Sequence, residues 1–352
     1  MNHLIYLFFI SALIIYFLNN FLLNNNLLIY NNKISHHKDE YKSKILLSGG
    51  LCSLAYLIIY QIIFNLSKEF LLIIFFSVPF LLLGFFSDIN FVNKTKYRLS
   101  AMILFSTLSI YFLKLNIELL DIIFLKKILE NNFFSYFFVI LCLVIVVNGS
   151  NFIDGKHGNL TLFLLTSISS IVFLIEKNII QLTYYNDLLI LIPFLIIFTF
   201  FNFFEKSFFG DSGSYFFGSI LSLVAIDIFL KNNNLSAYYI ANLLIYPAYE
   251  VFVSVTRRSL SKRSALHPDK YHLHNLIFCM FNEKYINNRL INILTTLVIF
   301  TSNAFFIFLS SLNPENKKYQ LNLFFTYIFI YSVTYIILRF IVVRYKKNYN
   351  VR

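Results

Sequence analysis

The stretch FLLIIFFSVPFLLLGFFSD, residues 70–88, decides the architecture of this chain. Its first 18 residues carry no charge, and the run then ends on an aspartate, Asp88. Apolar runs of about 18 residues or more predict membrane-crossing helices, because about 20 helical residues span the hydrocarbon core of a bilayer. The stretch therefore predicts a transmembrane helix with an acidic side chain at its end.

The whole chain has the composition of this stretch. Its 352 residues are 58% hydrophobic and 13% charged, with 44 Phe and no Trp, and the mean hydropathy is +0.71. This apolar content far exceeds that of an ordinary soluble domain. We expect an all-α integral membrane protein, a single domain over residues 1–352 with about eleven transmembrane helices and ten as the alternative. The apolar segments are 3–23, 45–64, 69–86, 98–113, 133–147, 160–175, 187–204, 213–230, 237–255, 290–311 and 321–343.

The basic residues alternate between the two sets of connecting loops. Of the 29 Lys and Arg, 21 fall in or beside one set and eight in the other. Because basic residues are enriched in the loops on the cytoplasmic side of membrane proteins, this asymmetry places the N-terminus outside and the C-terminus in the cytoplasm. The net charge of +12 is thus explained by membrane topology, and we expect no nucleic-acid partner.

The unusual polar sequences all belong to the predicted cytoplasmic set. They are GFFSDINFVNKTKYR (84–98), NGSNFIDGKHGN (148–159), FFGDSGSYFFG (208–218) and the long loop 256–289. Transporters usually place their polar groups near the middle of the membrane, on broken helices. Polar groups at helix ends on one face instead favour chemistry on a soluble substrate at the cytoplasmic surface.

The motif NGSNFIDGKHGN has a polar residue at every third position. Asn148, Asn151 and Asp154 would share one face of a helical turn, and His157 continues the spacing. Gly155 lets the backbone turn or approach a ligand closely. The alternative is an ordinary polar helix end capped by Asn and Gly.

Two further acidic residues stand at helix ends. Asp211 precedes the eighth apolar segment, where it or Ser212 could cap the helix. A carboxylate there could hold Mg²⁺ against a phosphate, since Mg²⁺ prefers oxygen ligands; the alternative is a simple N-cap. Asp88 ends the third segment and Arg98 begins the fourth. The positive-inside rule explains basic residues at such ends, but it does not explain Asp88.

The stretch HPDKYHLHN, residues 267–275, lies in the loop 256–289, a cationic segment. Arg263, His272 and His274 could donate charge-assisted hydrogen bonds to a pyrophosphate. A zinc site is a rival, although the additional Cys or His ligands at the usual spacing are missing. A patch that binds lipid headgroups is another rival.

Taken together and in this order, the motifs resemble those of the polyprenyl-phosphate N-acetylhexosamine-1-phosphate transferases, glycosyltransferase family 4. The family pattern N-x-x-N-x-x-D-G matches 148–155, G-D-x-G-S matches 210–214, and H-x-H matches 272–274. The paired early glycines match Gly49 and Gly50. The family's paired aspartates are half kept, because Ser87 stands where the first would be and Asp88 matches the second. His157 also departs from the acid or amide of many members.

The resemblance implies an Mg²⁺-dependent enzyme, with Mn²⁺ as the alternative metal. It would transfer a HexNAc-1-phosphate, GlcNAc-1-phosphate above all, from a UDP-sugar to undecaprenyl phosphate and release UMP. Asp211, helped by Asn151, would hold the metal. Asp154 and His157 would lie near the nucleotide, with Asp154 among the catalytic residues, and Asn148 would contact substrate.

The remaining roles that the resemblance implies concern the two phosphate groups. Asp88 would orient or deprotonate the lipid phosphate, and Arg98 would pair with a phosphate. His272, His274 and Arg263 would contact the pyrophosphate and the sugar. The setting would be the inner membrane of a bacterium, in cell-wall, O-antigen or capsule biosynthesis, with membrane lipids as surroundings and a homodimer left open. The sequence does not indicate which UDP-sugar or glycan pathway is involved.

Two alternatives remain beside this enzyme. A transporter for an anionic lipid would need charges buried within its spans, and the spans here are nearly free of them apart from Glu250, Asp227 and Glu205 near their ends. A catalytically degenerate relative that only binds polyprenyl phosphate is the second, and Ser87 is the main argument for it.

Overall fold

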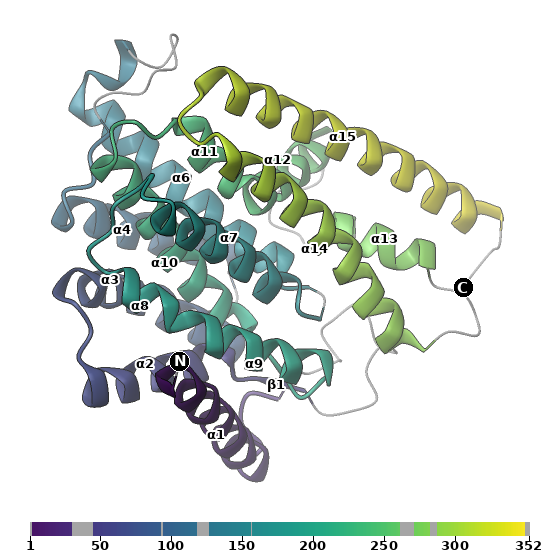
Figure 1. Ribbon diagram of the computed structural model, residues 1–352. Helices are drawn as coiled ribbons and strands as arrows, with labels where there is room; N and C mark the ends of the chain where they lie inside the picture. Colours follow the sequence, from purple (N-terminus) through teal and green to yellow (C-terminus); the bar gives the residue numbers. More distant parts are fainter. Residues whose placement is uncertain are drawn as a thin grey trace.

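The computed structural model describes residues 2–29, 45–92, 94–117, 127–155, 157–260, 271–281 and 287–348. Most of this part of the chain is helical (Figure 1), which confirms the all-α prediction. The helices are α1 (Asn2–Asn24), α2 (Gly49–Phe64), α3 (Lys68–Asp88), α4 (Thr95–Phe112), α6 (Asn132–Ile153), α7 (Asn159–Glu176), α8 (Tyr185–Leu189), α9 (Leu191–Phe203), α10 (Gly210–Lys231), α11 (Ala237–Leu243), α12 (Ile245–Leu260), α13 (Leu273–Phe281), α14 (Asn288–Leu312) and α15 (Lys317–Asn348).

Each of the eleven expected apolar segments coincides with a helix or a pair of consecutive helices. In the described residues, eight spans are long and apolar enough to cross a membrane, or nine if α11 and α12, bent by 73°, form one broken span. α2 has 16 residues, which is short for a crossing, and α4 carries Lys96 and Arg98 in its first turn. The chain is thus a polytopic membrane protein, while the count of eleven and the orientation stay predictions.

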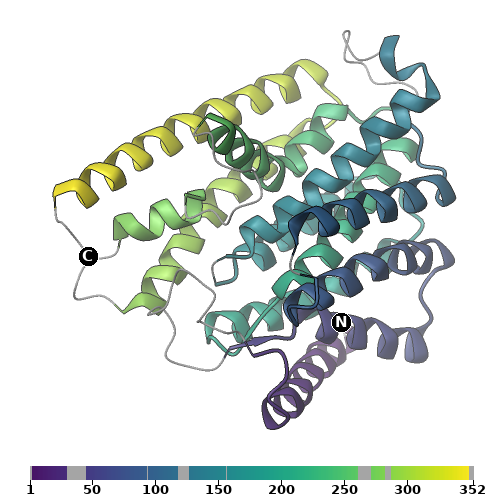
Figure 2. The ribbon, with the colours of Figure 1, turned by 180° about the vertical axis from the view of Figure 1, so that it is seen from behind.

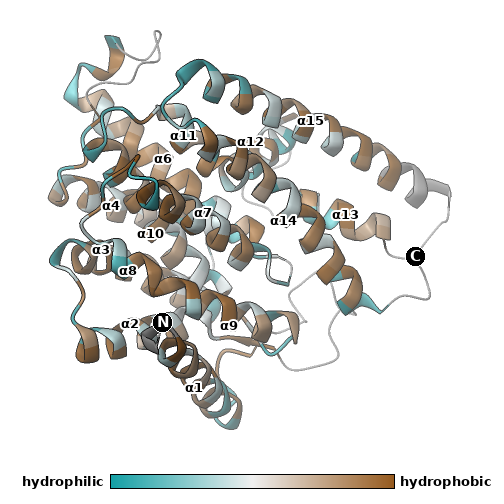
Figure 3. Ribbon diagram, viewed as in Figure 1, coloured by the Kyte–Doolittle hydropathy of each residue, from teal (hydrophilic) through white to brown (hydrophobic). Residues whose placement is uncertain are grey.

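The outer surface of the bundle is apolar. Figure 3 shows hydrophobic residues along the outward faces of α1, α14 and α15. Among the exposed side chains are Phe9 and Phe17 on α1, Phe305 on α14, and Phe325 and Phe329 on α15. A contiguous apolar surface of this kind would be unstable in water and is typical of helices that face lipid.

α10 is the central helix of the bundle. In its membrane window 83% of the residues are buried, more than in any other span of the described chain. It packs against α2, α3 and α6, and α3 and α6 in turn pack against α4; Figure 2 shows the bundle from the side on which α3 and α4 lie. The approach to α3 is very close: a Cβ added at Gly84 would lie 2.3 Å from the backbone oxygen of Asp211. A glycine at this point therefore lets the end of α3 meet the start of α10.

A short parallel sheet ties two distant segments together. β1 (Leu46–Leu47) pairs with β2 (Ser207–Phe208), immediately before α2 and α10. The hydroxyls of Ser48 and Ser207 lie 2.6 Å apart and are hydrogen-bonded. The sheet therefore sets the N-termini of α2 and α10 side by side, and α2 begins at Gly49, the first of the two paired glycines.

The opposite end of the bundle has its own polar contacts. Lys231 at the end of α10 lies 2.7 Å from Glu69 at the start of α3 and 2.9 Å from Asp227. Nearby, Asp187 accepts hydrogen bonds from the backbone N–H and the hydroxyl of Ser67. These contacts fix α3, α8 and α10 at the end remote from Asp88 and Asp211.

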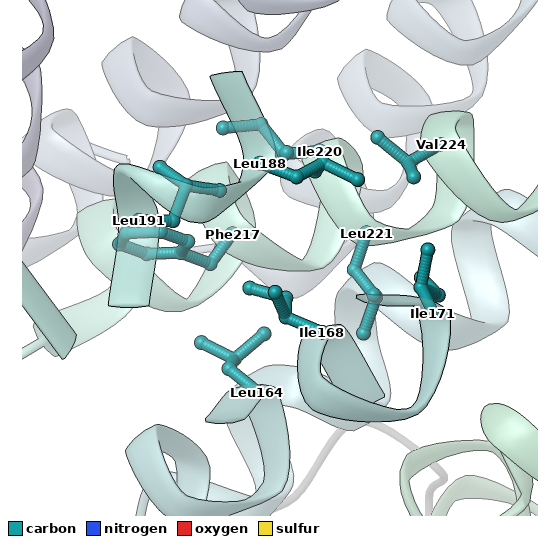
Figure 4. A pocket seen from close by; sticks show the side chains of 9 residues that line it. All are labelled: Leu164, Ile168, Ile171, Leu188, Leu191, Phe217, Ile220, Leu221 and Val224. Atoms are coloured by element: carbon teal, nitrogen blue, oxygen red, sulfur yellow. The ribbon is translucent and has the colours of Figure 1, made fainter. Parts of the chain in front are cut away.

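One apolar pocket lies inside the bundle, between α7, α8, α9 and α10 (Figure 4). No polar side chain lines it, so it is unsuited to a charged ligand. Its lining residues are Leu164, Ile168, Ile171, Leu188, Leu191, Phe217, Ile220, Leu221 and Val224.

Candidate active site

Four helix ends meet at one end of the bundle. α3 and α6 end there, and α4 and α10 begin there. Because each of these ends carries one of the polar motifs, residues that are far apart in the sequence come together. The prediction that the motifs share one face of the protein is therefore confirmed for this part of the chain.

The carboxylate of Asp211 is the centre of this cluster. Its Oδ1 accepts a hydrogen bond from Asn151 Nδ2 at 2.8 Å. Its Oδ2 accepts from Ser87 Oγ at 2.5 Å and from Arg98 Nη1 at 2.8 Å. The side chains of Arg98 and Asp211 are each 23% exposed, so a ligand can reach them. Asp211, at the start of α10, is thus held by side chains from α3, α4 and α6.

Asp88 caps α10 from a different helix. Its Oδ1 accepts from the backbone N–H of Asp211 at 2.9 Å, and its Oδ2 accepts from that of Ser212 at 3.0 Å. The expectation that Asp211 or Ser212 caps this helix is wrong, because α10 has no local side-chain cap. Gly210 has φ +68°, and a Cβ there would lie 2.8 Å from Asp88 Oδ2. Glycine at position 210 therefore allows the left-handed backbone and also leaves the space that the capping carboxylate of Asp88 occupies.

Asp154 adds a third carboxyl group directly after α6. Desolvation raises the pKa of Asp154 well above its ordinary value, and the neighbouring carboxylates of Asp88 and Asp211 raise it further. Three carboxyl groups, those of Asp88, Asp154 and Asp211, are thus close enough to interact, and the Arg98 guanidinium pairs with Asp211. Such an excess of acid favours a cation between them and disfavours the ionised form of Asp154 in its absence.

Asp154→Asn is expected to stabilise the protein against unfolding at neutral and higher pH. Because the pKa of Asp154 is raised by folding, ionising it costs the folded state free energy. The cost is absent below the ordinary pKa of about 4 and reaches its full size above the folded-state pKa. The gain in unfolding temperature in detergent should therefore be larger at about pH 8 than at about pH 5. An equal gain at both pH values would contradict this account.

The oxygen atoms of the cluster fit Mg²⁺. In the described residues no three His, Cys, Asp or Glu side chains form a ready-made metal cage. Mg²⁺ at phosphate sites commonly takes one or two carboxylates, with substrate phosphates and waters completing its shell. Asp88 is engaged in capping α10, whereas Asp211 has Asn151 at 2.8 Å and Asp154 as a neighbouring carboxyl group. The donor set therefore suits Mg²⁺ at Asp211, with Asn151 as the predicted helper and Asp154 as a further carboxylate, and these assignments stay predictions.

Two of the predicted substrate-binding residues lie to the sides of the cluster. Asn148 donates to the backbone oxygen of Val144 at 2.8 Å and to Met102 Sδ at 3.2 Å, between α6 and α4. His157 is fully buried, and its Nε2 lies 3.3 Å from Glu205 Oε1. Their contacts support the ends of α6 and α9, and their roles toward substrate stay predictions.

The H-x-H element lies against the motif at the end of α6. The rings of His272 and His274 are stacked, with centroids 5.5 Å apart and planes 8° apart, and Phe152 contacts the His272 ring. A Cβ added at Gly155 would lie 2.5 Å from His274 Nε2. His274 is thus brought to the glycine that follows Asp154. Arg263 lies outside the described residues.

Two features of the site were missed by sequence reasoning. Ser87 was noted as a departure, but its link to both Arg98 and Asp211 was not foreseen. Glu250 is 1% exposed on α12 and lies 3.1 Å from His272 Nδ1. An acid within an apolar segment was the signal that could have identified Glu250 as functional.

Comparison with known proteins agrees with this arrangement. Residues 70–229 match the family model described as Glycosyl transferase family 4, a range that contains the whole carboxylate cluster. Over 192 residues the chain is 27% identical to a probable undecaprenyl-phosphate N-acetylglucosaminyl 1-phosphate transferase of Bacillus subtilis (strain 168). That match covers 51% of this chain and 52% of the relative, so the chain spans about half the length of the relative it matches.

Proposed function

We propose that the chain, whose residues 70–229 match the family model described as Glycosyl transferase family 4, belongs to this family and transfers a HexNAc-1-phosphate from a UDP-sugar to undecaprenyl phosphate. GlcNAc is the sugar we propose first, because the similar protein of Bacillus subtilis (strain 168) carries this sugar and this acceptor in its name. The setting would be a bacterial inner membrane, with the site on the cytoplasmic face.

The observation that carries this proposal is the cluster around Asp211. It combines surplus carboxylates, one guanidinium and several amide donors at the ends of membrane helices. Transfer of a phosphoryl group depends mainly on positioning and on neutralising charge. An acceptor with a long isoprenoid chain stays in the bilayer, so a reaction site at the membrane surface suits it.

The residues of the cluster have distinct roles in this proposal. Asp211 and Asp154 would hold Mg²⁺, which when bound neutralises charge on the pyrophosphate and on the departing UMP. Arg98, already 2.8 Å from Asp211, would pair with a phosphate oxygen when substrate binds. Asp88 keeps the start of α10 in place through two backbone hydrogen bonds. It would also lie beside the incoming lipid phosphate.

The chemical step is a single displacement. An oxygen of the lipid phosphate attacks the β-phosphorus of the UDP-sugar and forms a new P–O bond. The bond from that phosphorus to the bridging oxygen breaks, and its electron pair leaves with UMP. A polyprenyl diphosphate sugar remains in the membrane, and no covalent intermediate with the protein is needed.

The test is UMP release by purified protein in detergent. The reaction would contain undecaprenyl phosphate, Mg²⁺ and one of several UDP-N-acetylhexosamines. Release with one donor that stops on chelation would support the function and identify the sugar. Absence of release with every donor from folded protein would contradict it and favour the degenerate relative, which binds polyprenyl phosphate without turnover.

Ser87→Asp separates the active enzyme from the degenerate relative. Ser87 donates to Asp211 Oδ2 and accepts from Arg98. A carboxylate at this position could still accept from Arg98, but it cannot donate to Asp211 and would repel it. We expect UMP release to be unchanged or several-fold lower in Ser87→Asp, with Ser87→Ala as the control that only removes the hydroxyl. A large gain in turnover would show that Ser87 marks a decayed site.

A further inference from the structure

Glu250 is a buried acid in a membrane helix with no part in the cluster around Asp211. It lies on α12 and is 1% exposed. Ionisable groups at such depth are costly unless they are paired and hydrogen-bonded. Its surroundings therefore indicate what it holds in place.

Both oxygens of the Glu250 carboxylate are used. Oε1 accepts from the hydroxyl of Tyr331 at 2.6 Å and from the backbone N–H of Leu273 at 3.1 Å. Oε2 lies 3.1 Å from Nδ1 of His272. One carboxylate on α12 thus joins α15, the first turn of α13 and the first histidine of the H-x-H element.

The contact with Glu250 favours one protonation state of the His272 ring. An ionised carboxylate can only accept hydrogen bonds, so this contact favours a proton on Nδ1 of His272, a nitrogen that also lies 3.3 Å from the hydroxyl of Ser254. The ring is also held by Phe152, with centroids 5.0 Å apart. Glu250 thus holds the His272 ring at Nδ1 and Phe152 packs against the ring, and together these contacts set its orientation.

The orientation of His272 is passed on to His274. Their rings are stacked with planes 8° apart. The His274 ring in turn lies so close to Gly155 that a Cβ there would approach Nε2 to 2.5 Å. Glu250, His272 and His274 therefore form one chain of contacts from α12 to the loop that follows Asp154.

We propose that Glu250 is a positioning residue that sets His274 against Gly155 by fixing the His272 ring. This inference rests on the proposed function, because only that function assigns the H-x-H element to the donor pyrophosphate. It assigns different roles to the two histidines: His272 holds the ring of His274 in place, and His274 contacts the substrate. It also makes α12 and α15, which lie beyond the matched residues 70–229, part of the active site.

Glu250→Gln is the test substitution, since glutamine keeps the shape and can still accept from Tyr331 and Leu273. Its amide would donate toward His272 and move the ring proton to Nε2. The matched control is Asp187→Asn, which alters another buried carboxylate at the remote end of the bundle, where it accepts from Ser67. Unfolding temperature, UMP release and ¹⁵N spectra of histidine-labelled protein are measured for both.

We expect Glu250→Gln to lower turnover on the order of 10- to 100-fold, as misplacement of a contact group does, while Asp187→Asn changes it less than about threefold at a similar loss of stability. In a His274→Gln background, the further effect of Glu250→Gln should shrink below about threefold. Equal effects of the two carboxylate variants, or an undiminished effect in the His274→Gln background, would overturn the proposal.

The ¹⁵N spectra keep this inference separate from the proposed function. In Glu250→Gln the protonated nitrogen of His272 should change from Nδ1 to Nε2, and the resonances of His274 should shift. Variants of His272 and His274 assign the signals among the seven histidines of the chain. If the unmodified protein releases no UMP with any donor, the proposed function fails. In that case the spectra alone test the positioning role of Glu250, and unchanged His274 resonances in Glu250→Gln would overturn it.

Discussion

Asp211→Asn is expected to lower the rate of UMP release by a factor on the order of 10³ or more, as removal of a central electrostatic group does. The carboxylate accepts hydrogen bonds from Asn151, Ser87 and Arg98. An asparagine has only one oxygen that can accept, and its NH₂ group would meet donor groups where the carboxylate has its second oxygen. The substitution leaves the Arg98 guanidinium without its ion-pair partner and removes a proposed Mg²⁺ ligand.

The matched control is Asp227→Asn, on the same helix at the other end of the bundle. Asp227 accepts from Tyr184 at 2.6 Å and pairs with Lys231, so its loss tests general damage to α10. We expect Asp227→Asn to keep UMP release within about threefold of the unmodified protein. Both variants are compared at saturating substrates, with unfolding temperature as a check on folding. Retention of a tenth of the activity by Asp211→Asn would contradict the role assigned to this carboxylate.

Much of the bundle could be predicted because membrane helices obey a simple requirement. A bilayer demands long apolar helices with internally satisfied backbones, so runs such as 70–88 identified helices such as α3. Spacing also carried information within one helix. Residues three apart share a face of a helix, and Asn151 and Asp154 both lie on the side of their motif that faces Asp211 and its neighbours.

Contacts between helices were beyond the sequence. Asp88 caps α10 although 123 residues separate it from Asp211 along the chain. Helix caps are usually supplied by the residue just before the helix, so a local pattern suggested Asp211 or Ser212. The actual cap depends on how α3 packs against α10, which no local pattern records.

The pairing of Glu250 with His272 was hidden for the same reason. An acid within an apolar segment was visible, and so was the H-x-H element, but they lie on different elements, 22 residues apart. The packing of α13 on α15, whose Tyr331 also contacts Glu250, places them side by side. A charge in an apolar segment predicts a partner without naming it.

Gly84→Ala is expected to cause a large loss of both stability and activity, although it changes no charge. A Cβ there would lie 2.3 to 2.4 Å from three backbone atoms of Asp211 and Ser212. Backbone cannot rotate away, so α3 must move from α10 by an appreciable part of an ångström or more. Overpacking of this kind costs about 1–3 kcal/mol, and more where nothing can yield.

The same shift would separate Asp88 from the amide groups that it caps and Ser87 from Asp211. A misplacement of about 1 Å can lower turnover on the order of 100-fold, so activity should fall further than stability alone predicts. The control is Gly218→Ala on α10, where the nearest atom is the Ser150 hydroxyl at 2.8 Å, a group that can turn aside. We expect a smaller fall in unfolding temperature and a smaller loss of UMP release in Gly218→Ala. Equal behaviour of the two variants would mean that the contact of α3 with α10 does not set the position of the carboxylate cluster.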